Sequence, residues 1–380
     1  MKTILASLFL LATSAHAEDL LELGVLDWQN FSADGSVLVG FQQATQFHAW
    51  DMNTGQKLSD FGIPGRTAID LSAFAVSPKG DHTVTVYDDL SVLVWNNQTG
   101  AEVLRGSLPQ FGNSNHYNGA RPLVWAPDGR RFAARVRRPD HVCVFNLNDG
   151  SRTCRAEPAV WEFAFLSDSE TLLTLDHDDC TLRHWNVRTL VSTDVANFNP
   201  DYSEGCHFFN PSSGRDLIMM GVQKIYRGPV STFVADARAG TIAEPLPSLM
   251  TPQYWMFASA PVSFDGLSFM AFDETRAGLC AVRLGQPQVQ TFCVLGRFYD
   301  SMNSQWALSH GGRWLATSLG TVVGTGFVEI RDTLTGTVTT HANPEPRIDR
   351  LSFTASGDLV IVAHDSALKR ARIMRLGLLD

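Results

Sequence analysis

The stretch His48–Leu58, HAWDMNTGQKL, decides the fold because its pattern returns along the chain. An aromatic residue is followed by Asp51, and Thr-Gly comes three residues after that acid. Related segments read LVWNNQTGAEV, CVFNLNDGSRT and EIRDTLTGTVT. Glycine can adopt the positive φ that a tight hairpin needs, and the Asp or Asn four residues before it can accept hydrogen bonds from turn amides. The pattern therefore predicts a hairpin turn that recurs in every structural unit.

A second pattern precedes each hairpin: an apolar run, then Ser, Pro or Asp, and then Gly, as in FSADG and VSPKG. It occurs eight times, with Ser in place of Gly in the fourth copy, and the average spacing is 46 residues. That period is typical of a four-stranded propeller blade. The landmark positions are Gly35, Gly80, Gly129, Ser169, Gly214, Gly266, Gly312 and Gly357.

The predicted fold is all-β: an eight-bladed β-propeller of four-stranded antiparallel blades, with a seven-bladed ring as the alternative. Strands between neighbouring blades should be apolar on both faces, and VLVGF and LLTL are. The last unit ends after its third strand, while Asp19–Gly24 precedes the first blade. We expect this segment to complete the last blade and leave no free sheet edge. The aromatic residues expected between blades are Trp50, Trp95, Phe145 and Trp185, with Ala235 and Arg331 at this position in later units.

The repeated FSADG…WDMNTG pattern resembles that of WD40-repeat β-propellers over nearly the whole mature chain. The resemblance is to a divergent, bacterial exported type of this family. The resemblance implies the fold and leaves the function open, because propellers serve many functions. Two features depart from the family. The Gly-His pair that begins a typical WD40 repeat is absent, which puts the buried hydrogen-bond tetrad of that family in doubt, and there are eight units instead of seven.

Residues 1–17 have the features of a secretory signal: Lys2, an apolar run from Ile4 to Ala12, and an Ala-x-Ala site ending at Ala17. Residues 18–380 are then one propeller domain, exported to the periplasm or the medium. No later stretch reaches the roughly 18 apolar residues of a membrane helix, so the protein is not expected to span a membrane. The net charge of −9 argues against nucleic acid or anionic lipid as the main partner.

Six cysteines in an exported chain predict disulfides, with six free thiols as the alternative. Cys143 and Cys154 flank the third hairpin turn, and Cys280 and Cys293 flank the sixth, so each pair should lie opposite on adjacent strands. Cys180 and Cys206 remain and would join neighbouring blades. No spacing typical of a metal or haem site occurs among them, and we expect no cofactor and no metal.

The connections between blades are long and rich in polar and aromatic residues, which are enriched where proteins contact partners. The alternative is that these loops fold over their own apolar residues. Candidate partner-binding residues are His116, Tyr117, Tyr202, Tyr254, Trp255, Arg297 and Tyr299.

Acidic turns follow the second strand of several units and could bind a cation or act as acid and base. We favour a turn-forming role for them, and a solvated position for His177. These acids are Asp88, Asp89, Asp176 to Asp179, Asp273, Glu274 and Asp365. A separate stripe of Arg131, Arg135 and Arg137 lies on one strand face, where we favour pairing with acids of the next blade over a basic docking patch.

The favoured function is a non-catalytic scaffold of the cell envelope, monomeric on its own, that binds a protein partner through the inter-blade loops. It would be similar in role to eight-bladed periplasmic propellers of outer-membrane protein assembly. No nucleophile–base motif, zinc-protease motif or phosphate-binding loop occurs. The alternative is an enzyme or ligand-binding propeller, a hydrolase or lyase acting on a glycan or lactone. A quinone-dependent dehydrogenase is disfavoured, because the tryptophan after the repeat glycine is missing in every unit.

Overall fold

The computed structural model describes β-strands joined by turns, with no α-helix in the described part of the chain. No helix in this part could cross a bilayer. The described residues are 17–24, 26–42, 46–66, 70–109, 123–136, 141–156, 160–176, 179–197, 206–209, 216–223, 230–250, 268–273, 278–283, 290–295, 305–319, 327–342, 347–365 and 370–377.

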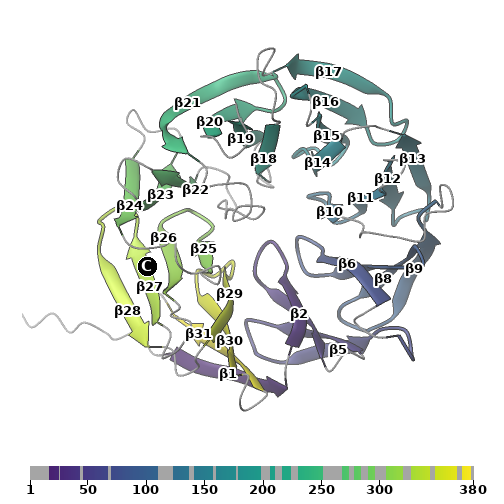
Figure 1. Cartoon of the computed structure of the whole chain (residues 1–380). Coiled ribbons are helices and arrows are strands. Elements are labelled where there is room, and N and C mark those ends of the chain that lie inside the picture. The colour runs from purple at the N-terminus through teal and green to yellow at the C-terminus, as the bar shows by residue number, and fades with distance from the viewer. Residues whose placement is uncertain are drawn as a thin grey trace, which may run out of the picture.

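Antiparallel four-stranded sheets follow one another along the chain and stand around a common centre, with the first strand of each unit innermost (Figure 1). The first three sheets are β2 (Leu26–Phe31), β3 (Val37–Gln42), β4 (Gln46–Asp51) and β5 (Lys57–Phe61); β6 (Leu71–Val76), β7 (His82–Tyr87), β8 (Ser91–Asn96) and β9 (Glu102–Ser107); and β10 (Leu123–Trp125), β11 (Arg131–Val136), β12 (His141–Asn146) and β13 (Arg152–Ala156).

The other three four-stranded sheets come from the middle and both ends of the chain. They are β14 (Val160–Phe165), β15 (Thr171–Asp176), β16 (Thr181–Asn186) and β17 (Ser192–Asn197); β25 (Trp306–Leu308), β26 (Trp314–Leu319), β27 (Phe327–Asp332) and β28 (Val338–Ala342); and β29 (Arg347–Phe353), β30 (Leu359–Asp365), β31 (Arg370–Leu376) and β1 (Ala17–Gly24). Strand β1 is therefore the outer strand of the last sheet, where the sequence placed Asp19–Gly24.

One sheet has seven strands and lies where the sequence predicts two blades. In it a single residue pair, Met250 and Phe272, joins β21 to β22. Its strands are β18 (Cys206–Phe209), β19 (Leu217–Gln223), β20 (Val230–Asp236), β21 (Thr241–Met250), β22 (Ser268–Asp273), β23 (Gly278–Arg283) and β24 (Gln290–Leu295).

The hairpin turns form as predicted. The Gly55 amide donates to the Asp51 carbonyl at 2.8 Å, and the Asn53 amide donates to Asp51 Oδ1 at 2.7 Å. The landmark glycine Gly35 has φ +68°, and a Cβ there would lie 2.0 Å from the carbonyl oxygen of Phe353 in the last sheet. Glycine is thus required at this turn both by its backbone conformation and by the close approach of a neighbouring sheet.

The core consists of apolar layers between adjacent sheets, and both faces of β3 and of β15 are covered as predicted. The aromatic residues Trp50, Trp95, Phe145 and Trp185 are all buried in these layers. Burial leaves the indole N–H groups in need of acceptors. Trp185 Nε1 donates to Thr174 Oγ1 at 2.7 Å, and Trp95 Nε1 donates to Thr85 Oγ1 at 3.1 Å.

The first predicted disulfide is present: Cys143 lies opposite Cys154 on β12 and β13, and the two are bonded. Cys280 lies opposite Cys293 in the register of β23 and β24, and a bond between them stays a prediction. Cys180 is buried and disulfide-bonded. The side chain of Cys206, its predicted partner, lies outside the described residues.

Candidate functional site

The alternation of strand direction divides the turns between two faces of the ring. One face, the loop face, carries the connections between sheets and the turns between second and third strands. The opposite face, the hairpin face, carries the turns that join the first strand to the second and the third strand to the fourth. The sequence placed partner binding on the loop face. All seven predicted partner-binding residues, His116, Tyr117, Tyr202, Tyr254, Trp255, Arg297 and Tyr299, lie outside the described residues.

The described strands add a feature of the loop face that sequence reasoning missed. In four sheets the innermost strand has a register shift close to its start, on the loop-face side. A bulge of this kind leaves one residue unpaired in the ladder, redirects its side chain and is common beside functional sites. No sequence pattern reveals the bulge, because it is defined by pairing with the next strand. The bulged residues are Asp27, Ser72, Trp161 and Asp349.

In the second sheet the bulge lies beside an acidic turn. Ser72 Oγ donates a hydrogen bond to Asp88 Oδ1, and the Asp88 amide donates to the Asp70 carbonyl at 2.9 Å. The neighbouring Asp89 accepts from both terminal nitrogens of Arg66, which comes from the connection between the first two sheets. The Arg66 guanidinium also lies 4.6 Å from the centre of the Tyr87 ring. This corner therefore holds fixed charged groups next to an aromatic ring.

The carboxylate of Asp89 has a low pKa for a clear physical reason. The hydrogen bond from Arg66 is the main cause and lowers the pKa, partial burial opposes it, and hydrogen bonds from Ser91 lower it further. One of these comes from the Ser91 amide at 2.9 Å, which gives Asp89 the turn-forming role that we favoured. The side chain of Asp89 is 52% exposed, so it remains available to a partner.

In the last sheet the bulged residue Asp349 lies between a basic side chain and an imidazole. Arg347 Nε is 2.7 Å from Asp349 Oδ1, and His364 Nδ1 is 3.8 Å from Asp349 Oδ2. Arg347 is exposed, while Asp349 and His364 are mostly buried. The loop face thus offers an exposed guanidinium here and an exposed carboxylate at Asp89 in the second sheet.

The acids of the fourth unit form an ion-pair cluster around one arginine. Arg183 lies 3.2 Å from Asp176, 3.9 Å from Asp179 and 2.9 Å from Asp194. The Thr181 amide also donates to Asp179 at 2.8 Å, in agreement with a turn role. His177, Glu274 and the side chains of Asp273 and Asp365 lie outside the described residues. Among the described residues no three His, Cys, Asp or Glu groups converge as a metal site.

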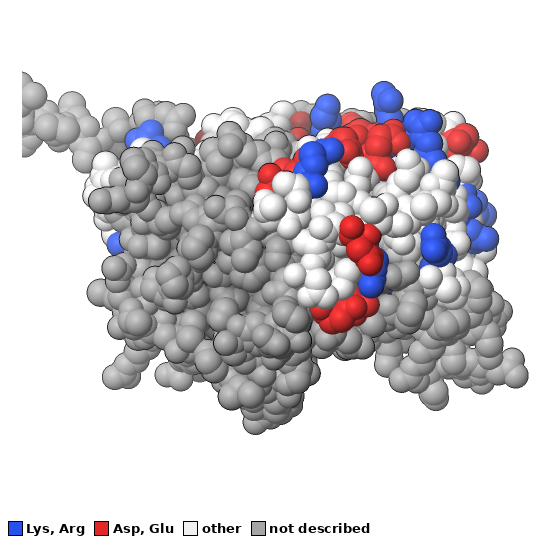
Figure 2. All heavy atoms as spheres, turned by 90° about the horizontal axis from the view of Figure 1, so that it is seen from above, with Lys and Arg blue, Asp and Glu red and all other residues white. Residues whose placement is uncertain are grey.

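On the hairpin face, basic and acidic side chains lie next to each other; Figure 2 shows such an alternation along the upper edge of the ring. Part of the predicted arginine stripe belongs here. Arg131 Nη2 lies 3.0 Å from Glu170 Oε1 in the next sheet, so its favoured structural pairing is confirmed. Arg135 is buried, and Arg137 lies outside the described residues.

The structure is similar to solved WD40 domains and to a computationally designed protein. The match to the WD40 domain of SCAP from fission yeast has a TM-score of 0.61 and 10% identity, and covers 96% of this chain and 98% of that one. The match to the C-terminal WD40 domain of Sif2 has a TM-score of 0.60 and 11% identity, and covers 95% of this chain and 99% of that one. The match to the computationally designed Ika8 protein has a TM-score of 0.57 and 14% identity, and covers 95% of this chain and 99% of that one.

No family model and no curated protein sequence matches the chain. At these identities the likeness to solved structures shows the fold alone. The chain has the fold of a WD40-like β-propeller, built from repeated four-stranded antiparallel sheets.

Proposed function

We propose that this protein is a non-catalytic interaction platform that binds a protein partner through its loop face. WD40 propellers commonly mediate protein interactions, which makes this the first function to test. The observation that carries the proposal is the bulge repeated in four innermost strands, because each one lies on the loop face. Partner binding needs a rigid surface with fixed, exposed polar groups. Asp89 and Arg347 are such groups, since each is exposed and held by an ion pair.

We further propose that the platform has eight blades. The average spacing of 46 residues between landmark positions supports this number. The seven-stranded sheet would then be two blades, β18–β21 and β22–β24, since one residue pair alone joins them. The sequence predicts the first strand of the second blade just before the landmark Gly266, in residues outside the described ranges. Pairing of β1 with β31 supports a ring without a free sheet edge.

The proposed location is the cell envelope or the medium. This proposal depends on residues 1–17, which lie outside the described residues except for Ala17. An apolar run followed by an Ala-x-Ala site is the sequence pattern of an exported chain. N-terminal sequencing of the protein from its native host tests it, and an intact Met1 in the mature protein would contradict export by this route.

The platform itself is tested by affinity capture from the native envelope, with charge reversals on each face. We expect the wild type and the hairpin-face control Arg130→Glu to recover the same partner. The loop-face double variant Asp89→Lys, Arg347→Glu should lose it, because exposed rim charges govern encounter and register. Equal capture by all three proteins would contradict loop-face binding. Turnover by the purified protein in a panel of glycan and lactone substrates would favour the enzyme alternative.

A further inference from the structure

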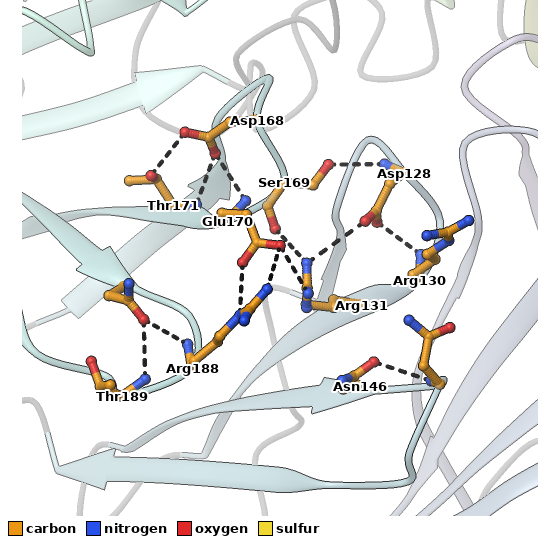
Figure 3. A network of polar contacts seen from close by, with 12 residues as sticks. Asp128, Arg130, Arg131, Asn146, Asp168, Ser169, Glu170, Thr171, Arg188 and Thr189 are labelled. Atoms are coloured by element: carbon orange, nitrogen blue, oxygen red, sulfur yellow. Dashed lines mark hydrogen bonds and ion pairs between the residues drawn. The ribbon is translucent and has the colours of Figure 1, made fainter.

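A groove of about 460 Å³ lies on the hairpin face, between the third and fourth sheets. Its walls come from the turn between β12 and β13 and from the turn between β16 and β17. This groove is separate from the loop face to which the proposed function belongs. Figure 3 shows the polar network beside it, in which side chains from the two sheets point toward one another.

One wall carries an accessible guanidinium. Arg131 Nη2 lies 3.0 Å from Glu170 Oε1, and Arg188 Nε lies 3.3 Å from Glu170 Oε2. One carboxylate therefore forms ion pairs with two arginines. Arg131 is only 11% exposed, whereas the Arg188 side chain is 73% exposed. The Arg188 guanidinium is therefore the one that a bound carboxylate can reach.

The opposite wall carries a carboxylate and neutral hydrogen-bonding groups. The Ser151 amide donates to Asp149 Oδ1 at 2.9 Å. Hydrogen bonds from Ser151, and the more distant charge of Arg131, hold the pKa of Asp149 below its usual value, so this group stays ionised at neutral pH. Asn146 and Asn148 lie beside it along the same turn.

Between the two charged walls the groove is lined by apolar groups. Val144 on β12 and Val187 after β16 both line it, and both side chains are otherwise buried in the layer between the sheets. Only 4% of Val144 and 3% of Val187 is exposed, so the floor of the groove offers little apolar surface and the charged walls decide what binds.

Two residues in the turns beside the groove depart from the repeat pattern. The fourth unit has Ser169 and Leu190 where most other units have glycine, and both keep positive φ, +58° and +50°. Such conformations cost energy and persist where surrounding contacts hold them, often at functional sites. Ser169 Oγ accepts from the Asp128 amide at 3.0 Å, and its carbonyl accepts from Arg131 at 3.1 Å. These contacts fix the Arg131–Glu170 wall across the two sheets.

From the opposite charges on the two walls we propose that the groove binds an extended peptide segment with an acidic and a basic side chain two positions apart, because an extended backbone places such side chains on the same face. The acid pairs with Arg188 and the base pairs with Asp149, while the side chain between them points away from the groove. Peptide amides and carbonyls face the side chains of Asn146 and Asn148. A uniformly acidic or uniformly basic segment would meet a like charge on one wall.

The test measures binding of a fluorescein-labelled Gly-Glu-Val-Lys-Gly peptide by anisotropy, and of the peptides in which Glu or Lys becomes Gln. We expect millimolar to high micromolar affinity, and a loss of about threefold to fivefold on neutralising one exposed pair. Arg188→Gln should weaken the parent peptide and leave the Glu-to-Gln peptide unchanged, because the contact is already lost. Asp149→Asn should show the same relation with the Lys-to-Gln peptide.

Arg130→Gln is the matched control, since Arg130 is an exposed arginine on the neighbouring turn that does not line the groove. It should bind all three peptides as the wild type does. Equal weakening of all peptides by Arg188→Gln, or no saturable binding up to about 5 mM, would overturn the proposal. Loss of the envelope partner from the loop-face variant would leave this result unaffected, so the two proposals fail separately.

Discussion

Leu21 of β1 lies opposite Ile373 of β31, so the two ends of the described chain are neighbours in one sheet. Leu21 also packs against the layer that contains Trp50 and Val360. Substitution Leu21→Asp places a charge in this layer, and we expect a loss of about 2–3 kcal/mol in the free energy of unfolding. Urea denaturation measures it. The exposed Glu22→Gln should change stability by less than about 0.5 kcal/mol, and equal effects would show that β1 contributes little.

The conformation of Ser169 predicts an unusual order of stability among variants. Ser169→Gly relieves the positive φ and loses the hydrogen bond from Asp128, and these effects nearly cancel. Ser169→Ala loses the bond and keeps the strain, so it should be less stable than the Gly variant by about 1–2 kcal/mol. Thermal unfolding of the three proteins tests the order. An Ala variant as stable as the Gly variant would show that the turn changes conformation.

The disulfide between Cys143 and Cys154 closes a short loop around one hairpin. We expect the double variant Cys143→Ser, Cys154→Ser to lose about 2–3 kcal/mol in the free energy of unfolding. Peptide mapping without reduction checks the two remaining predicted pairs, Cys280–Cys293 and Cys180–Cys206. A Cys180 crosslink to a different cysteine would contradict the predicted staple between neighbouring blades.

Acid should weaken the contact between Arg66 and Asp89. The pKa of Asp89 in the folded protein is lowered below its ordinary value of 3.8. The ionised carboxylate therefore contributes fully to the free energy of unfolding well above pH 3.8, and this contribution is lost as pH falls through the lowered pKa. Asp89→Asn keeps a turn acceptor and removes the charge. Because Asp89 is half exposed, we expect a difference of at most about 1 kcal/mol from the wild type at neutral pH. Urea denaturation across pH measures it, and a difference that grows toward low pH would contradict the sign.

The sequence predicted the features that depend on local chemistry. Asp51 and Gly55 form the turn that their spacing indicated, because an Asx acceptor and a positive φ are properties of a few consecutive residues. The burial of Trp50 and Trp185 and the pairing of Cys143 with Cys154 follow from the same repeated register. The hairpin periodicity was therefore enough to place the strands, the layers between sheets and the outer position of β1.

The functional surfaces could not be predicted in the same way. The bulges at Ser72 and Asp349 exist only through pairing with a second strand, and the ion pair of Arg66 with Asp89 joins the connection between the first two sheets to a turn of the second sheet. The sequence predicted that Arg131 pairs with an acid of the next blade, but that Glu170 is this acid and also meets Arg188 depends on how the start of β11 packs against two turns of the next sheet.

By itself the sequence determined the repeating hairpins, since turn geometry depends on neighbours along the chain. Only the tertiary structure decided which charges face one another across two sheets, because those distances depend on how separate units pack.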